Sequence, residues 1–371
     1  MEIPWIINEQ TKVKHNLLNS YIKKWAGILY NQQVRMGLPE ILVYIDGFAG
    51  PGLYWNNEAK ENTCSGSPVI VAKTANQYID NKPSRRFIII GIDKSIECVQ
   101  ILQKELNKIN RHNQYWKSIH AEFDNVFNSL LNDLESKKFT LPPMFVFIDP
   151  FGFSGFPMNT LKRILKYERA ELFINFIIYD IIRFLNEREE YMNDLFACTD
   201  FKEANEFSSS EKKQNFLINL YCKQLKDIAK AEYVMPFRIN TPNQGTRPKY
   251  YLIHASKHIK ALKEMKDSMA KHSDCEYKFE AIGLTDSQFE LFENPDKIIL
   301  KERLIDFLKN GSKKQIEFTN LENWAYANTN GIKKTIQNAL IELEKEKIIE
   351  IERHPRQRKS TVTEGAIISV L

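Results

Sequence analysis

The chain has 371 residues, of which 43% are hydrophobic and 27% charged, and its net charge is +5. This composition is typical of a globular protein and excludes a disordered one. The five cysteines form no CxxC pair, and the chain has neither an apolar run of about 18 residues nor a secretory signal. We therefore expect a cytoplasmic protein without a metal site, a disulfide framework or a membrane span.

Helices and strands alternate through the first half of the chain. Leu17, Tyr21 and Trp25 lie at helical spacing, which predicts a helix over residues 11–36. Short apolar runs predict buried strands at 41–45, 85–93, 115–123, 144–149 and 170–178. The segments between them predict helices at 67–79, 95–110, 126–136 and 158–168. Strands that are apolar throughout and alternate with helices indicate a parallel sheet covered on both faces.

The sheet is predicted to end in an antiparallel hairpin. A charged helical insertion at about 180–230 precedes two apolar segments, 232–241 and 248–256, and a helix at 257–273. A parallel sheet finished by such a hairpin is the pattern of class I methyltransferases, whereas a dehydrogenase-type sheet would continue in parallel. We therefore predict an α/β fold with a Rossmann-like class I methyltransferase sheet over residues 1–290.

From residue 297 the pattern changes. Amphipathic helices are predicted at 296–311, 319–329 and 331–348, followed by strands at 348–352 and 366–371. Three helices and a two-stranded wing predict a winged helix-turn-helix domain over 297–371. This domain holds 14 of the 52 Lys and Arg but only 10 of the 47 Asp and Glu, so most of the net positive charge belongs to it.

The stretch YIDGFAGPG, residues 44–52, follows the first strand, and its glycines let the backbone approach a ligand closely. A dinucleotide-binding turn would run straight into a helix, but the next helix starts only at Ser67, its predicted N-cap, and no GK[ST] sequence makes a P-loop. An acid before the glycines is instead the methyltransferase form, in which the carboxylate binds the methionine amino group of S-adenosylmethionine directly or through water. This interpretation assigns cofactor binding to Asp46, Gly47, Phe48, Ala49, Gly50 and Gly52. A purely structural turn is the alternative.

Acids follow the next two strands as well. Asp93 ends the strand at 85–93, where a carboxylate can accept hydrogen bonds from both ribose hydroxyls of the cofactor. A helix N-cap is the alternative, because Asp93-Lys94-Ser95 also opens a helix, and both roles could hold at once. Asp124 follows the third strand, where contact with the adenine and helix capping are equally open. Asp93, Lys94 and Asp124 thus complete the predicted cofactor site.

FIDPFGFSG, residues 147–155, follows the fourth strand. Its Asp149, Pro150, Phe151 and Gly152 resemble the [DNS]PP[YFW] motif of methyltransferases that modify the amino group of adenine or cytosine. In that motif the acid or amide and a proline carbonyl accept hydrogen bonds from the amino group, and an aromatic ring stacks on the flipped base. The match is partial, because phenylalanine replaces the second proline and glycine the aromatic residue, so that Phe151 or Phe153 would stack. An aromatic-rich structural turn is the alternative.

Isolated polar residues carry weaker signals. His15 and His254 could line the cleft, although packed or surface positions are the stronger interpretation. Arg247 and Lys249, in the hairpin connection, could contact a phosphate, although a solvated loop fits better.

In the tail, the third helix would enter the major groove and the basic wing would contact phosphates. The residues predicted to bind nucleic acid are Lys333, Lys334, Gln337, Arg353, Arg356, Arg358 and Lys359, with His354 beside them. Docking to a protein is the alternative, because Glu342, Glu344 and Glu346 on the same helix would repel nucleic acid.

Taken together, these segments resemble the three-Cys-motif partner family. The resemblance rests on YIDGFAGPGLY, the delayed GSP before the first sheet helix, FIDPFGFSGFPM, YYLIHASKHIKALKEMKDSM and the tail, and it covers nearly the whole chain. The family is regarded as methyltransferase-like and occurs in mobile or defence-type gene settings of bacteria and phages. It takes its name from a gene neighbour with a three-cysteine motif, which makes such a protein a candidate partner.

Two functional hypotheses follow. The first is an S-adenosylmethionine-dependent methyltransferase that acts on nucleic acid, DNA or RNA, at an exocyclic amino group. The second is a non-catalytic methyltransferase-like scaffold that binds nucleic acid or a partner protein in a defence complex, motivated by the imperfect DPFG motif. A nicotinamide-dependent oxidoreductase is disfavoured by the delayed helix and the closing hairpin.

Overall fold

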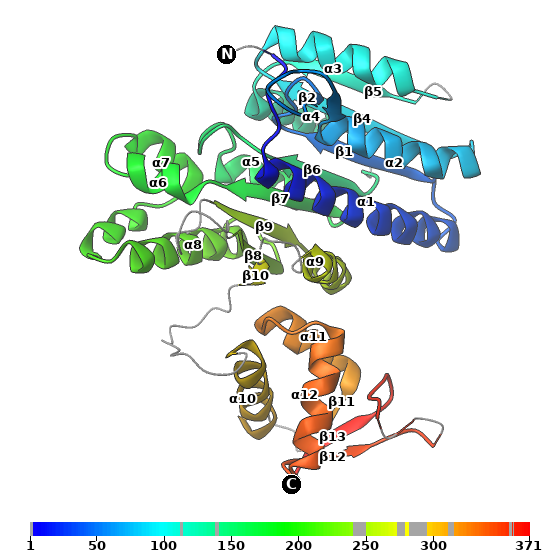
Figure 1. The fold of residues 1–371 in the computed structure, drawn as a ribbon, viewed down its shortest axis with the longest axis vertical. Coiled ribbons are helices and arrows are strands. Elements are labelled where there is room, and N and C mark those ends of the chain that lie inside the picture. The colour runs from blue at the N-terminus through cyan, green and yellow to red at the C-terminus, as the bar shows by residue number, and fades with distance from the viewer. Residues whose placement is uncertain are drawn as a thin grey trace. The chain divides into compact units, whose positions relative to one another are not determined.

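The computed structural model describes residues 3–111, 114–137, 141–239, 250–272, 279–281, 295–310, 315–355, 358 and 360–371. These residues belong to two compact units, Met1–Phe279 and Glu280–Leu371 (Figure 1). Buried hydrophobic side chains form a core within each unit.

The first unit is built on a sheet with the strand order β8-β9-β7-β6-β1-β4-β5. Its strands are β1 (Ile41–Asp46), β4 (Arg86–Asp93), β5 (Trp116–His120), β6 (Met144–Ile148), β7 (Ala170–Phe176), β8 (Tyr233–Ile239) and β9 (Tyr250–Ser256). A further short strand, β10 (Phe279–Ala281), spans the point in the chain where one unit ends and the other begins. Strands β5, β4, β1, β6 and β7 run parallel, whereas β9 is antiparallel to both β7 and β8. The predicted α/β architecture, a mainly parallel sheet with an antiparallel closing hairpin, is therefore confirmed.

Two helical layers cover the sheet. The helices of this unit are α1 (Glu9–Arg35), α2 (Ser67–Asn81), α3 (Ile96–Ile109), α4 (Phe123–Lys137), α5 (Met158–Leu165), α6 (Ile178–Phe184), α7 (Glu189–Phe196), η1 (Asp200–Glu206), α8 (Ser210–Asp227) and α9 (Ile259–His272). Helix α1 packs beside α2 and α9, and α5 packs beside α4, α7 and α8. On β7, Glu171 bonds to Tyr21 of α1, while Phe176 stacks on Tyr221 of α8. Because odd and even strand residues face opposite sides, the two layers cover opposite faces.

A small hairpin that was not predicted follows the glycine turn. Strands β2 (Leu53–Trp55) and β3 (Thr63–Ser65) pair antiparallel, and Ile6 bridges to Trp55, so the N-terminal segment lies beside them. The N-cap of α2 is Gly66, which makes no side-chain bond, so the prediction of Ser67 as N-cap is wrong. The Ser67 side chain instead bonds to Asp46.

Within the described residues, the second unit has three helices and a three-stranded antiparallel sheet in the order β11-β13-β12. Its elements are α10 (Pro295–Asn310), β11 (Gln315–Glu317), α11 (Phe318–Asn328), α12 (Lys333–Lys345), β12 (Ile349–Glu352) and β13 (Ile367–Val370). Leu304, Leu340 and Ile368 are fully buried in its core. Only two strands were predicted, because three residues of β11 are too few to show an alternating pattern.

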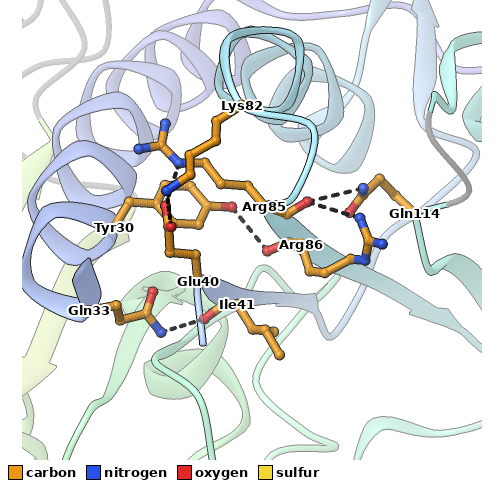
Figure 2. A network of polar contacts seen from close by, with 8 residues as sticks. All are labelled: Tyr30, Gln33, Glu40, Ile41, Lys82, Arg85, Arg86 and Gln114. Atoms are coloured by element: carbon orange, nitrogen blue, oxygen red, sulfur yellow. Dashed lines mark hydrogen bonds and ion pairs between the residues drawn. The ribbon is translucent and has the colours of Figure 1, made fainter. Parts of the chain in front are cut away.

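A polar network ties α1 to the amino ends of β1 and β4 (Figure 2). Glu40, just before β1, accepts hydrogen bonds from Lys82 and from Arg85 Nε, the latter at 2.9 Å. The Arg85 guanidinium lies 4.6 Å from the centre of the Tyr30 ring, and the Tyr30 hydroxyl donates to the Arg86 carbonyl at 3.0 Å. Hydrogen bonds from Lys82 and Arg85 hold the pKa of Glu40 below its usual value.

We expect Glu40→Gln to lower the unfolding free energy at about pH 7 by about 1 kcal/mol, because it removes a charge-assisted pair. A carboxyl with a lowered folded pKa stabilises the protein above its unfolded pKa of about 4.3, and this stabilisation is lost as the pH falls. Urea unfolding at about pH 7 and about pH 3.5 measures the difference between the two proteins. An equal difference at both pH values would contradict the ion-pair explanation.

Candidate functional site

A cavity of about 390 Å³ opens near the carboxyl ends of β6 and β7, close to the glycine turn after β1. Its lining comes from the N-terminal segment, the first turns of α1, the two predicted motifs and the start of α6. The lining residues are Trp5, Ile6, Asn8, Gln10, Thr11, Lys14, Phe48, Tyr54, Asp149, Pro150, Phe151, Gly152, Asn175, Ile177, Tyr179, Asp180 and Tyr250. The whole predicted catalytic motif, 149–152, therefore lies at one cavity.

Two of the predicted acids hold the glycine turn between them. Asp46 Oδ1 accepts from the Phe48 backbone N–H at 3.3 Å, and Asp93 Oδ2 accepts from the Gly50 N–H at 2.9 Å. The other oxygen of Asp93 accepts from the Ser95 N–H at 2.8 Å. The N-cap of α3 is Ser95 rather than Asp93, so the capping alternative for Asp93 is wrong. Both acids thus lie at the same turn, from neighbouring strands β1 and β4.

Asp46 is a fully buried carboxyl group. Burial raises its pKa to about 7, although hydrogen bonds from Ser67, Tyr44 and the Phe48 backbone act in the opposite direction. The Tyr44 hydroxyl donates to Asp46 Oδ2 at 2.9 Å. Burial makes the ionised form of this carboxyl group unfavourable. A cation beside it, such as an ammonium group, would stabilise the ionised form.

The turn depends on glycine at its end. Gly52 has φ +71°, and a Cβ atom there would lie 2.5 Å from Leu102 Cδ1 and 3.1 Å from Val69 Cγ2. The backbone of Gly66 also lies close to that of Gly52, because a Cβ atom on Gly66 would lie 2.9 Å from the Gly52 carbonyl carbon. A side chain at position 52 would therefore require Leu102 and Val69 to shift.

Gly52→Ala should therefore lower the unfolding free energy by about 2–4 kcal/mol, combining the left-handed backbone with overpacking. Gly37→Ala is the matched control, because Gly37 also has a positive φ of +64° but nothing within 4 Å of its Cβ position. The control should lose only about 1 kcal/mol, the backbone part alone. Urea unfolding compares the two, and equal losses would disprove the crowding of Gly52.

Asp149 lies in a cluster that the sequence did not predict. Asn175 Nδ2 donates to Asp149 Oδ1 at 2.7 Å, and Lys14 of α1 forms an ion pair with Oδ2. Lys14 is buried, at 7% exposure. Each carboxylate oxygen thus has one protein partner, and because a carboxylate has about four acceptor sites, two remain for a substrate amino group. A signal for Lys14 was present, since it lies on the apolar stripe of α1 with Leu17, Leu18 and Tyr21.

Exposed aromatic rings lie beside this cluster. Phe151 is 77% exposed and Tyr179 is 61% exposed, and both line the cavity. Trp5 packs edge-on against Phe151, with ring centres 4.8 Å apart. Phe153, the other predicted stacking residue, does not line the cavity and packs against Phe184 at 5.7 Å. Phe151 and Tyr179 thus present exposed aromatic rings at this cavity.

Other predicted residues lie away from the cavity. Strand β5 ends at His120, so Asp124 is not at a strand end as expected, but in the first turn of α4, where it accepts from the Thr160 hydroxyl. Lys94 is exposed just after β4. Neither residue lines the cavity, and nor do Asp46, Gly47, Ala49, Gly50, Gly52 and Asp93. Phe48 connects the glycine turn to it.

The two histidines are packed residues. His15 is buried beside Tyr54, with ring centres 5.6 Å apart, and burial lowers its pKa to about 4. His254 is buried against Glu171, at 3.0 Å from Nε2 to Oε2. The packed interpretation therefore fits both. Arg247 and Lys249 lie outside the described residues.

The predicted nucleic-acid residues of the second unit differ in their surroundings. Lys333, Lys334, His354 and Arg358 are exposed. Gln337 Nε2 donates to the Val362 carbonyl at 2.5 Å. Two nitrogens of Arg353 bind the two oxygens of Glu344, at 2.6 Å and 2.5 Å, so this guanidinium is engaged within the unit. Arg356 and Lys359 lie outside the described residues.

Comparisons with known proteins give no family. No protein-family model matches the chain, and no curated protein matches it either. No group of three or more metal-binding side chains gathers among the described residues, and none of the described helices is long and apolar enough to span a membrane.

Many solved structures align with the chain, and three examples have low similarity to it. Protein LPL1258 from Legionella pneumophila, of family model DUF519, is 10% identical with a TM-score of 0.43, covering 74% of this chain and 97% of that chain. An O-methyltransferase from Bacillus cereus in complex with SAH is 11% identical with a TM-score of 0.35, covering 68% and 84%. PKMT2 from Rickettsia typhi, in complex with AdoHcy, is 10% identical with a TM-score of 0.25, covering 93% and 74%.

Proposed function

We propose that the protein is an S-adenosylmethionine-dependent methyltransferase that acts on an exocyclic amino group of a nucleic-acid base. The observation that carries the proposal is the pairing of Asp46 and Asp93 across one glycine turn, beside a cavity that contains Asp149 and exposed Phe151. The strand order, a parallel sheet closed by antiparallel β9, is the pattern expected of class I methyltransferases.

The residues around the glycine turn fit the cofactor. Asp46, buried with a raised pKa, would gain from the ammonium of the methionine end. Asp93 accepts two backbone hydrogen bonds, and a carboxylate has about four acceptor sites, so two remain for ribose hydroxyls. Bound S-adenosylmethionine would supply a methyl group, whose transfer breaks a sulfur–carbon bond, forms a nitrogen–carbon bond and releases one amino proton to water.

The aromatic rings at the cavity support a base as the substrate. A base that leaves its stack can be held between aromatic side chains, and stacking contributes about 1–3 kcal/mol per base. Phe151 and Tyr179 offer such surfaces. Pro150 and Asp149, which line the same cavity, would orient the amino group.

The second unit would deliver the nucleic acid. Its element order fits a winged helix, with α12 in the position of the recognition helix. Lys333 and Lys334 begin α12, and His354 and Arg358 belong to the connection between β12 and β13. We leave Gln337 and Arg353 out of this surface because both are half-buried and hydrogen-bonded within the unit. Lys333 stays in it because its side chain is exposed and its ion-pair partner, Glu322, lies 3.9 Å away. The family resemblance further suggests a three-Cys-motif protein as partner and a mobile-element or defence setting.

Two measurements test this proposal. Isothermal titration with S-adenosylmethionine and S-adenosylhomocysteine should show binding to the wild type, weakened at least about tenfold in Asp93→Ala, a change of about 1.4 kcal/mol. Tritiated cofactor should then label DNA or RNA rather than a protein pool. Absence of cofactor binding would refute the enzyme assignment and leave the scaffold hypothesis.

A further inference from the structure

The segment before α1 forms an N-terminal strap, residues 4–8, that lies beside β2. The Trp55 N–H donates to the Trp5 carbonyl at 2.8 Å, and the Ile7 N–H donates to the Trp55 carbonyl at 2.9 Å. The strap ends at Asn8, the N-cap of α1, whose side chain accepts from the Thr11 N–H. It is thus a separate short segment between the chain end and α1, and β2 holds it next to the glycine turn.

Trp5 of the strap covers Gly50 of the glycine turn. A Cβ atom on Gly50 would lie 3.0 Å from Cζ3 of the Trp5 ring, and Gly50 is buried. A glycine lets another group approach its backbone closely, and the group that approaches Gly50 is this indole ring. The space that the missing side chain leaves beside the turn is therefore filled by the protein's own tryptophan.

The same ring reaches the residues proposed to hold the substrate. Trp5 lines the cavity that contains Asp149, and it packs edge-on against the exposed Phe151 ring at 4.8 Å between ring centres. Trp5 itself is half-buried. One side chain on a short strap thus contacts both the turn proposed to bind the cofactor and the motif proposed to orient the base.

We propose that the strap is a lid on the cofactor site, and that Trp5 leaves Gly50 before S-adenosylmethionine binds at the glycine turn. The inference rests on the proposed function and adds a conformational step to it. The strap is suited to this motion because two backbone hydrogen bonds hold it on β2 and Ile6, next to the ring, is 45% exposed. Segments with few buried contacts open most readily, and ligand-binding lids are drawn from them.

Removal of the ring tests the lid through the sign of its effect on binding. A closed lid lowers the apparent affinity by the fraction of molecules that are open. Isothermal titration with S-adenosylhomocysteine should therefore show about tenfold tighter binding in Trp5→Ala than in the wild type, or about 1.4 kcal/mol. A ring that only supported the fold, or that only contacted the bound cofactor, would have the opposite effect, because its removal would weaken binding.

Trp324→Ala is the matched control. Trp324 is also half-buried and packs on an aromatic ring, that of Phe307, at 4.0 Å between ring centres, but it belongs to the second unit. This variant should bind S-adenosylhomocysteine as the wild type does.

Tryptophan fluorescence gives a second readout, which reports the motion itself. In the wild type, S-adenosylhomocysteine should shift the emission to longer wavelength as the Trp5 ring moves into water. The shift should be absent from Trp5→Phe, which keeps an aromatic ring in the strap.

The outcomes separate the lid from the proposed function. Tighter binding in Trp5→Ala, together with loss of the emission shift in Trp5→Phe, supports the lid. Equal or weaker binding in Trp5→Ala overturns it, and so does an emission shift that persists in Trp5→Phe, while binding by the wild type leaves the cofactor site in place. If neither the wild type nor Trp5→Ala binds S-adenosylhomocysteine, the proposed function fails and the lid fails with it.

Discussion

Asp46→Asn should make the protein more stable at about pH 8, by about 2–4 kcal/mol, while weakening its affinity for the cofactor. The carboxyl of Asp46 is fully buried and its pKa is raised to about 7, with burial as the largest cause. Keeping it charged in the folded protein is therefore unfavourable. Asparagine keeps the size and an acceptor for the Phe48 N–H but carries no charge.

The sign of the pH dependence follows from the raised pKa. Between about pH 4 and about pH 7, the folded protein keeps a proton on Asp46 that the unfolded chain has released, so stability falls as the pH rises. Asparagine does not titrate, so this fall in stability with rising pH is absent in the variant. The two proteins should thus be similar at about pH 4 and differ most above about pH 7.

Urea unfolding across this pH range measures the first effect, and isothermal titration with S-adenosylhomocysteine measures the second. Asp133→Asn is the control, since Asp133 is an exposed acid on α4. It should change neither quantity. A variant at position 46 that is less stable at every pH would show that the hydrogen bonds of Asp46 outweigh the cost of its burial. Unchanged cofactor affinity would remove Asp46 from the binding site.

Asp149→Ala should lower methyl transfer by about 10²-fold or more, because it releases both Lys14 and Asn175. It should also lower the unfolding free energy by about 3–5 kcal/mol, since it leaves the Lys14 ammonium buried without its partner. The loss of activity and the loss of stability have different causes, and a second substitution separates them.

Adding Lys14→Met to Asp149→Ala removes the unpaired charge and keeps an apolar side chain of similar length on α1. We expect the double variant to recover most of the lost stability but none of the lost activity. Denaturant unfolding and tritium transfer of the two single variants and the double variant complete the cycle. Recovery of activity in the double variant would show that Asp149 acts only by neutralising Lys14.

Much of the fold could be predicted because it depends on short-range patterns. Strands such as β6 and β7 are buried along their whole length, and a continuous apolar run is the direct consequence of burial on both faces. The convergence of Asp46 and Asp93 was also predictable, since parallel strands bring their carboxyl ends to one edge of a sheet. The same reasoning was wrong for Asp124, because β5 ends four residues before it, at His120.

The surroundings of individual polar and aromatic side chains were harder to predict from the sequence. Tyr179 has no local signal that separates it from other surface tyrosines. Gln337 and Arg353 look like free polar groups in the sequence, and only folding of the second unit brings them to Val362 and Glu344. Asn175 lies inside an apolar strand, where a single polar residue was a signal that could have been followed.

By itself, the sequence determined the alternation of elements, the parallel sheet with its antiparallel end, and the acids and glycines that follow the strands, because these depend on residues close together in the chain. Only the tertiary structure decided that Lys14, Asp149 and Asn175 meet, that Asp46 is buried, and that Phe151 is exposed. Lys14 and Asn175 belong to elements far apart in the chain, α1 and β7. Their contact arises from packing of α1 on the sheet, which no local pattern of residues encodes.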